Sequence, residues 1–303
     1  MATSLLTQTN RAPAPAHTQP QRATGSLVLE FKRDPVLETT VLSASAQQPP
    51  LRIVRPFPLS NGSVLVHLHN VSGGLLGGDH LLTSVNVGSG ASVQLTTTGA
   101  TRVYRCLEDR EAALQVNRFT IATDGLLEYV PDAIIPFAKS RFRQETTVDI
   151  EMGGGLFWWE ILAPGREARG EVFAYDSVEL KTELKVPGRP ISAENVRLQP
   201  ANRDLRSTAR LGPYRYWITF YIVRVGVEPN SWLAAEQKLR EVVSRFAVSG
   251  EALWGVSTLA AHGLVVRGLT RRGSGILASL RAVWNEAKLL LYGCEAIPPR
   301  KIN

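Results

Sequence analysis

Hydrophobic and polar residues alternate with a period of two over most of the chain between Ser26 and Val227. Such alternation predicts β-strands, because successive side chains of a strand point to opposite faces of a sheet. Glycine, proline, asparagine and aspartate interrupt the pattern, as turns require. The predicted strands are SLVLEFK (26–32), SVLVHLH (63–69), LLTSVNV (81–87), ASVQLTT (91–97), LQVNRFTIA (114–122), FRQETTVDIEM (142–152), EVFAYDSVEL (171–180) and YRYWITFYIVRV (214–225). A sandwich, a barrel and a β-solenoid are all compatible with this series.

Two later segments have the period of an amphipathic helix instead. In SWLAAEQKLREVVSRF (231–246) the apolar residues share one face, and Ser231 is suited to accept an N-cap hydrogen bond. In GILASLRAVWNEAKLLLYG (275–293) a second apolar stripe ends at Gly293, which is suited to close the helix. The intervening LWGVSTLAAHGLVVRGL (253–269) predicts two more strands. The chain is therefore expected to be mainly β, with two amphipathic helices in its C-terminal half.

Composition divides the chain into a short tail and one domain. Residues 1–25 contain no acid and several prolines, so they are expected to be disordered. A transit peptide is the alternative, but the segment is not convincingly amphipathic. Residues 26–303 are expected to form a single domain, since 44% hydrophobic residues suffice for a core and no stretch approaches the roughly 20 apolar residues of a membrane helix.

The net charge and the two cysteines limit the ligands and the cellular compartments that fit this sequence. The net charge is +7, but lysine and arginine are scattered and lack an interleaved stacking motif, so nucleic-acid binding is not expected. A solvated basic surface, with acidic proteins as the partners that would suit it, is the favoured interpretation. Cys106 and Cys294 are far apart and outside any C-x-x-C pattern, which predicts neither a disulfide framework nor a zinc site. A cytoplasmic location is the simplest expectation.

The segment VSGGLLGGDH (71–80) resembles a phosphate-binding loop only in its glycines. A loop of that kind needs lysine and a hydroxyl residue after the last glycine, where this chain has an acid and a histidine, and no helix is predicted to follow. A tight turn with positive φ that presents Asp79 is the expected structure. The turn residues are Gly73, Gly74, Gly77 and Gly78.

Two histidines are candidate metal ligands. His67 and His69 are two residues apart, so on a strand they share a face, and His80 is the candidate third ligand. The alternative is that both are ordinary surface or core histidines, because a pair without a third ligand seldom holds a metal.

Several segments together resemble the UreD (also called UreH) family of urease accessory proteins. They occur in one order and cover roughly residues 26 to 300. The segments are HNVSGGLLGGDHL (69–81), LTTTGATRVYR (95–105), LEYVPDAIIPFAKSRFRQ (127–144), GLFWWEILAPGREARGEVF (155–173) and PPR (298–300). His80 and the terminal PPRKIN depart from the pattern of many relatives, which affects the transfer of local charge and terminal contacts.

The resemblance implies a fold and a role. The fold is an elongated, β-helix-like stack of sheets. The role is that of a non-catalytic chaperone that binds apo-urease and the accessory protein UreF, which recruits the GTPase UreG. Together these proteins deliver nickel to the urease active site, in this family through a water-filled internal passage. Nickel is then a transient cargo, and no tightly bound cofactor is expected.

Acids inside apolar segments are the candidates for lining such a passage, because an internal carboxylate is costly unless it is paired or hydrated. Carboxylates also hold nickel loosely enough to release it. The candidates are Asp79, Glu128, Asp132 and Glu160. The alternative for each is exposure to solvent or pairing with an arginine such as Arg141 or Arg166, and for Asp79 a hydrogen bond to its own turn.

The sequence allows two further interpretations, one of a possible contact site and one of the function. Arg102, Tyr104 and Arg105 are candidates for pairing with acids or contacting a partner, although their segment is also compatible with a plain hairpin. The main alternative function is a β-solenoid carbohydrate-active enzyme that uses paired acids, here Glu128 and Asp132 with Arg141. The chain has no G-x-S-x-G or H-E-x-x-H motif, so we expect no enzyme.

Overall fold

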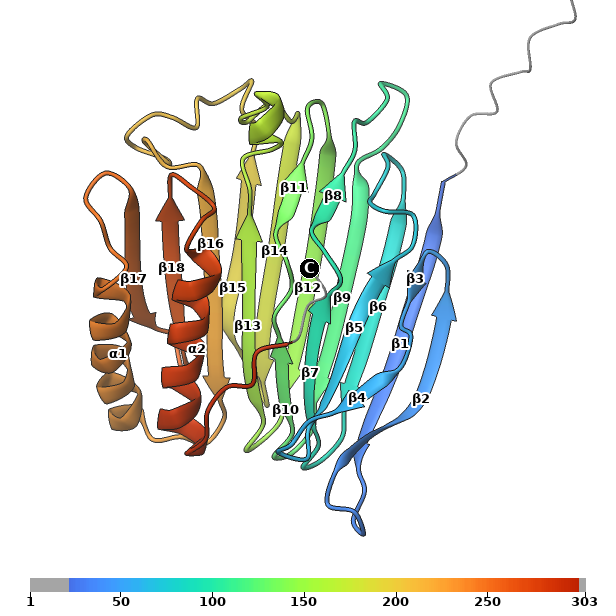
Figure 1. The fold of residues 1–303 in the computed structure, drawn as a ribbon, viewed down its shortest axis with the longest axis vertical. Helices are drawn as coiled ribbons and strands as arrows, with labels where there is room; N and C mark the ends of the chain where they lie inside the picture. The colour runs from blue at the N-terminus through green and yellow to red at the C-terminus, as the bar shows by residue number, and fades with distance from the viewer. Residues whose placement is uncertain (1–21, 300–303) are drawn as a thin grey trace, which may run out of the picture.

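In the computed structural model, which describes residues 22–299, two β-sheets face each other and two helices cover one end of the second sheet (Figure 1). The first sheet has the order β15–β14–β12–β9–β6–β1–β2. Its strands are β1 (Thr24–Arg33), β2 (Thr40–Gln48), β6 (His80–Val87), β9 (Ala113–Ile121), β12 (Arg141–Ile150), β14 (Ser177–Val186) and β15 (Arg189–Leu198).

The second sheet has the order β17–β18–β16–β13–β10–β7–β5–β3, with three short strands beside this path. Its strands are β3 (Leu51–Arg52), β4 (Pro56–Pro58), β5 (Val64–Asn70), β7 (Ser92–Thr97), β8 (Thr101–Val103), β10 (Leu126–Tyr129), β11 (Ile134–Pro136), β13 (Gly155–Leu162), β16 (Tyr216–Arg224), β17 (Ala252–Thr258) and β18 (Gly263–Thr270). The chain passes back and forth between the sheets from β5 to β14, so that β6, β9, β12 and β14 are parallel neighbours in one sheet and β5, β7, β10 and β13 in the other. This winding confirms the predicted β-helix-like stack.

The alternating pattern of the strands produces the core between the sheets. Leu29, Phe119 and Trp158 point inward and are almost fully buried, whereas their sequence neighbours on the first sheet face outward. Burying each such side chain contributes roughly 1.5–3 kcal/mol. One predicted strand begins late: in 171–180 the strand β14 starts only at Ser177, because the preceding residues form a loop in which Phe173 donates its N–H to the carbonyl of Pro164.

The helices α1 (Pro229–Ser244) and α2 (Ile276–Tyr292) pack on the outer face of the second sheet, and a short 3₁₀ turn spans Glu167–Arg169. Gly293 ends α2 in a left-handed conformation, as predicted. The N-cap prediction for Ser231 is wrong. The helix begins at Pro229, whose fixed φ suits the first helical position, so Ser231 lies inside the first turn and makes no capping bond.

After α2 the chain crosses the outer face of the second sheet toward its centre (Figure 1). The side-chain amide of Gln94 donates to the carbonyl of Ile297, and the N–H of Ala296 donates to Asn285. The predicted tail over 1–25 lies largely outside the described residues, although Thr24 and Gly25 belong to β1, and PPRKIN lies outside them from residue 300 onward. Within the described part of the chain, no helix is long and apolar enough to cross a membrane.

Candidate functional site

The glycine loop, residues 71–80, has positive φ angles at two of its glycines and close packing at the two others. Gly73 and Gly78 have φ of 78° and 86°, a conformation that side chains with a Cβ rarely adopt. A Cβ on Gly77 would instead fall on the Sγ of Cys106, and one on Gly74 would crowd the carbonyl of Arg102. Backbone conformation and lack of space therefore both require glycine here.

Asp79 ties this loop to the first strand. Its carboxylate accepts the N–H of Ala23 at 2.9 Å and the N–H of Leu76, in its own turn, at 2.8 Å. The residue is buried. Both oxygens are thus occupied by backbone donors, so the geometry gives Asp79 a place in the turn, and its role in nickel transit stays a prediction.

The segment around β8 lies against the glycine loop. Leu75 donates its N–H to the carbonyl of Arg102 and accepts the N–H of Tyr104 at its own carbonyl. The Tyr104 ring packs edge-on against Phe137. Arg102 and Arg105 are exposed and form no ion pair with any residue from 22 to 299. Their contact with a partner remains a prediction.

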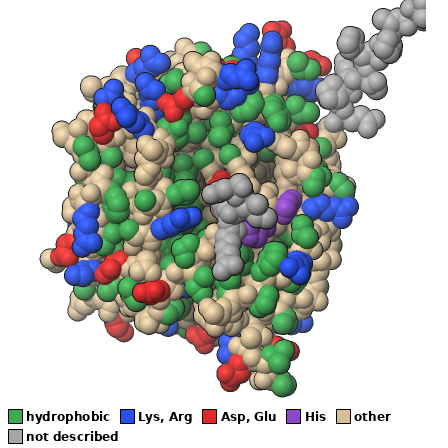
Figure 2. Space-filling model, in the orientation of Figure 1, with side chains coloured by type: hydrophobic (Ala, Val, Ile, Leu, Met, Phe, Trp, Pro, Cys, Tyr) green, Lys and Arg blue, Asp and Glu red, His purple; other side chains and the backbone are tan. Residues whose placement is uncertain are grey.

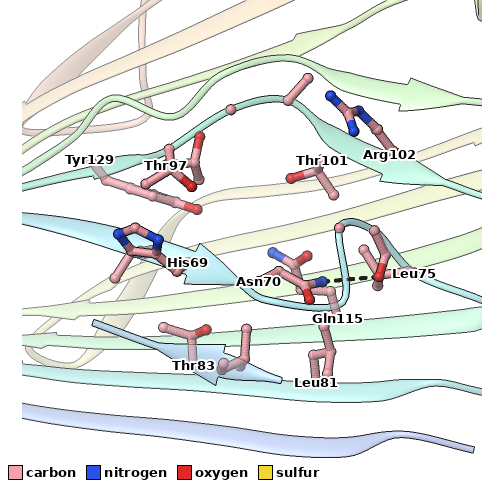
Figure 3. A pocket seen from close by; sticks show the side chains of 17 residues that line it. His69, Asn70, Leu75, Leu81, Thr83, Thr97, Thr101, Arg102, Gln115 and Tyr129 are labelled. Carbon is pink, nitrogen blue, oxygen red and sulfur yellow. Dashed lines mark hydrogen bonds between the residues drawn. The ribbon is translucent and has the colours of Figure 1, made fainter. Parts of the chain in front are cut away.

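A pocket of about 250 Å³ opens beside the glycine loop (Figure 3). Hydroxyls, amides, one imidazole and one guanidinium supply its polar lining, from Thr83, Thr97, Thr98, Thr101, Tyr129, Asn70, Gln115, His69 and Arg102. No carboxylate is among its lining residues. The pocket therefore has both polar and apolar walls, and it carries a positive side chain but no negative one.

From this pocket a row of polar side chains runs across five strands of the first sheet, on the face that packs against the second sheet. Cross-strand pairing joins Thr83, Asn117, Thr146, Thr182 and Glu194 in that order. We call these five residues the polar row. Its four uncharged members are buried, where apolar side chains would be expected. Gln115 on β9 and Gln144 on β12 are paired with each other, two residues before Asn117 and Thr146, and so flank the row.

Glu160 on β13 faces the polar row from the second sheet. It is half-buried and accepts a hydrogen bond from the side-chain amide of Gln144. Burial raises the pKa of Glu160 to about 7, the bond from Gln144 opposes this, and the nearby Glu194 adds to it. Glu160 and Glu194 line one small cavity, so the far end of the polar row carries two carboxylates.

Glu128 lies on β10 but faces away from the polar row. Its carboxylate accepts bonds from the ammonium of Lys288 and the indole of Trp284, each at 2.9 Å, and both partners belong to α2. Burial raises the pKa of Glu128, and attraction to Lys288 opposes the shift. The geometry therefore places Glu128 in a buried ion pair under a helix, and its role in nickel transit stays a prediction.

His67 and His69 lie on β5, His80 lies on β6, and Asp132 follows β10. The Asp132 carboxylate accepts a bond from the hydroxyl of Thr97 at 3.3 Å. His67 packs edge-on against Phe57, and His69 lines the pocket. His80 lies on β6 in the other sheet, so the predicted third ligand is not brought to the pair. Among residues 22–299 there is no group of three or more His, Cys, Asp or Glu side chains arranged to hold a metal.

The two arginines considered as partners of these acids bind elsewhere. Arg141 donates to the sulfur of Cys106 and to backbone carbonyls, among them that of Leu107 at 2.6 Å. Arg166 forms an ion pair with Glu171, and this contact lowers the pKa of Glu171. The constellation that the enzyme alternative requires, Glu128 and Asp132 with Arg141, is therefore not assembled.

Basic side chains do not gather into one patch on the face shown in Figure 2: many lie toward its edges, with acids among them, and others lie nearer its centre. Cys106 is buried, Cys294 is exposed, and both are free thiols. These observations agree with the scattered charge and the lack of a disulfide framework in the sequence.

Comparison with known proteins defines the class of this chain as a urease accessory protein. Residues 23–303 match the sequence model of the UreD urease accessory protein family. The urease accessory protein UreD of Herpetosiphon aurantiacus is 44% identical over 285 residues, which is 94% of this chain and 98% of that protein. UreD of Staphylococcus aureus strain bovine RF122 is 28% identical over 218 residues, 72% of this chain and 76% of that protein. The chain belongs to the UreD family, which implies a role in urease maturation.

Proposed function

We propose that the chain is a maturation scaffold that binds apo-urease and the UreF–UreG accessory proteins and passes nickel, in a GTP-dependent process, toward the urease active site. The ion moves inside this protein, between its two sheets. The protein acts in the cytoplasm and catalyses no reaction of its own.

The main support for this proposal is the polar row. It connects two hollows that lie at different parts of the molecule, because Thr83 lines the pocket at the glycine loop and Thr182 with Glu194 lines the cavity at Glu160. Within the row, the side-chain amide of Asn117 donates to the hydroxyl of Thr146 at 3.1 Å. A continuous row of buried hydroxyl and amide groups is nevertheless costly in an apolar core, so it favours a hydrated route over simple packing.

The ligands along the route suit a cargo that must leave again. Hydroxyls, amides and single carboxylates bind a divalent ion more weakly than clustered imidazoles or thiolates. The pocket without carboxylates and the cavity with two give the route a direction, because a cation is drawn toward the negative end. Partner proteins then have to meet the surface at both hollows.

Co-expression with urease and its other accessory proteins at limiting nickel tests the proposal. Omission of the chain should abolish both urease activity and nickel in the enzyme. Glu160→Ala should lower both while the chain still folds and binds its partners, whereas Glu145→Ala, on the outer face of β12, should change neither. Full activity without the chain would refute the proposed function.

A further inference from the structure

We infer that the pocket beside the glycine loop is a binding site for a small organic anion, a carboxylate carried on a short apolar body. Arg102 recognises the charge, and hydroxyl and backbone N–H groups of the surrounding loops donate hydrogen bonds to the carboxylate. The inference goes beyond the proposed function and does not depend on it, because the ligand is a free small molecule and no metal ion takes part.

The charge of the lining favours an anion. Arg102 is exposed, lines the pocket and forms no ion pair with a described residue, so its guanidinium is available to a ligand. The carboxylate of Asp132 accepts a bond from the lining residue Thr97, but Asp132 itself is outside the lining. A guanidinium without a protein counter-ion is well suited to bind a carboxylate from solution, through paired N–H donors.

The backbone of the glycine loop has a donor to spare, while its acceptors are occupied. The carbonyl of Gly73 accepts the hydroxyl of Tyr104 at 3.3 Å. The carbonyl of Gly74 accepts the side-chain amide of Asn70 at 3.1 Å. The N–H of Gly74 has no partner in the described part of the chain, although the residue is buried. Buried backbone donors are rarely left without an acceptor, so an acceptor from a ligand or water is expected here.

A second loop and a buried tyrosine add further donors. Gly99 and Ala100 line the pocket, and their N–H groups bond to no residue from 22 to 299. Tyr129 is only 6% exposed, and its hydroxyl, which lies among the lining side chains in Figure 3, likewise has no described partner. Burial raises the pKa of Tyr129, and the charge of Glu160 adds to the shift, so the phenol stays protonated and donates. Unused donors around one space form an arrangement that binds oxyanions.

The size and the apolar walls determine the kind of anion. The volume of about 250 Å³ corresponds to roughly eight water molecules of the liquid, which is more than a bare oxyanion fills. Four leucines form the apolar part of the lining: Leu51, Leu68, Leu75 and Leu81. A carboxylate with a short apolar body would cover these leucines while its charge meets Arg102.

Isothermal titration calorimetry of the purified chain with sodium benzoate tests the site, with benzamide and inorganic phosphate as comparison ligands at constant ionic strength. Benzoate should bind with one-to-one stoichiometry and about tenfold or more tightly than benzamide, which has nearly the same shape without the charge. Phosphate should bind more weakly than benzoate, because it leaves the leucines uncovered.

Variants separate recognition of the charge from folding. Arg102→Gln should weaken benzoate binding about tenfold or more. Tyr129→Phe should weaken it several-fold at unchanged thermal stability, because the lost hydroxyl has no protein partner. Arg105→Gln is the matched control and should bind as the wild type does, since Arg105 is also exposed on this segment but does not line the pocket.

Three results would each overturn the site: equal affinity for benzoate and benzamide, tighter binding of phosphate than of benzoate, or wild-type affinity in Arg102→Gln. These results are separate from the fate of the proposed function, which fails only if urease acquires nickel without this chain.

Discussion

The ammonium of Lys288 on α2 lies 2.9 Å from a carboxylate oxygen of Glu128 on β10, and both side chains are only 1% exposed. Removing one partner leaves an uncompensated charge in the core. Lys288→Met should therefore lower the free energy of unfolding by about 3–5 kcal/mol, measured by urea denaturation. The double variant Glu128→Gln with Lys288→Met should regain most of this loss, because no buried charge remains.

An exposed ion pair supplies the control for these substitutions. Lys185 pairs with Glu183 on the outer face of the first sheet, where water screens the charges. Lys185→Met should change the free energy of unfolding by less than about 1 kcal/mol. A small loss in Lys288→Met, or no recovery in the double variant, would show that the buried pair does not hold α2 on the sheet.

The two glycines before Asp79 should respond differently to a second substitution. Gly77→Ala places a Cβ on the sulfur of Cys106, so Cys106→Ala should restore much of the lost thermal stability. Gly78→Ala is strained by its φ of 86°, at roughly 1–2 kcal/mol, and Cys106→Ala should give no rescue. Equal rescue of both variants would contradict these separate causes.

The strands and helices were predictable because their periods are local properties of the sequence. The inward position of Glu160 could also be predicted, because this residue stands between two large apolar residues in the sequence. The partner of Glu128 could not be predicted, because Lys288 is distant in sequence and only the packing of α2 brings the two residues together. The polar row depends on the register of five strands, so its threonines and Asn117 looked like ordinary strand residues.

The ion pair of Arg166 and Glu171 should make stability depend on pH below neutrality. Its contact with Arg166 lowers the pKa of Glu171 below 4.5, and the N–H of Ala138 adds a bond to the same carboxylate. The stabilisation is present above pH 4.5 and is lost as the pH falls through the lower folded-state pKa. Glu171→Gln should therefore cost about 1 kcal/mol at pH 7, and this cost should shrink as the pH falls below 4.5. Urea denaturation at several pH values measures this difference, and a constant difference would contradict it.

Asp79 and Glu160 should separate stability from nickel transfer. Both oxygens of Asp79 accept backbone N–H groups, so Asp79→Asn loses one of these bonds and should lower the free energy of unfolding by about 1–3 kcal/mol. Nickel per urease active site, corrected for the amount of folded chain, should stay at the wild-type level, because Asp79 does not line either hollow.

Glu160→Gln should behave in the opposite way. It removes a charge from the cavity without breaking a backbone bond, so thermal stability should be kept or increased while nickel in urease falls. Thermal unfolding and metal analysis of co-expressed urease measure both quantities for both variants. A stable Asp79→Asn that blocks nickel loading would place Asp79 on the route, and the path would then have to pass through the glycine loop itself.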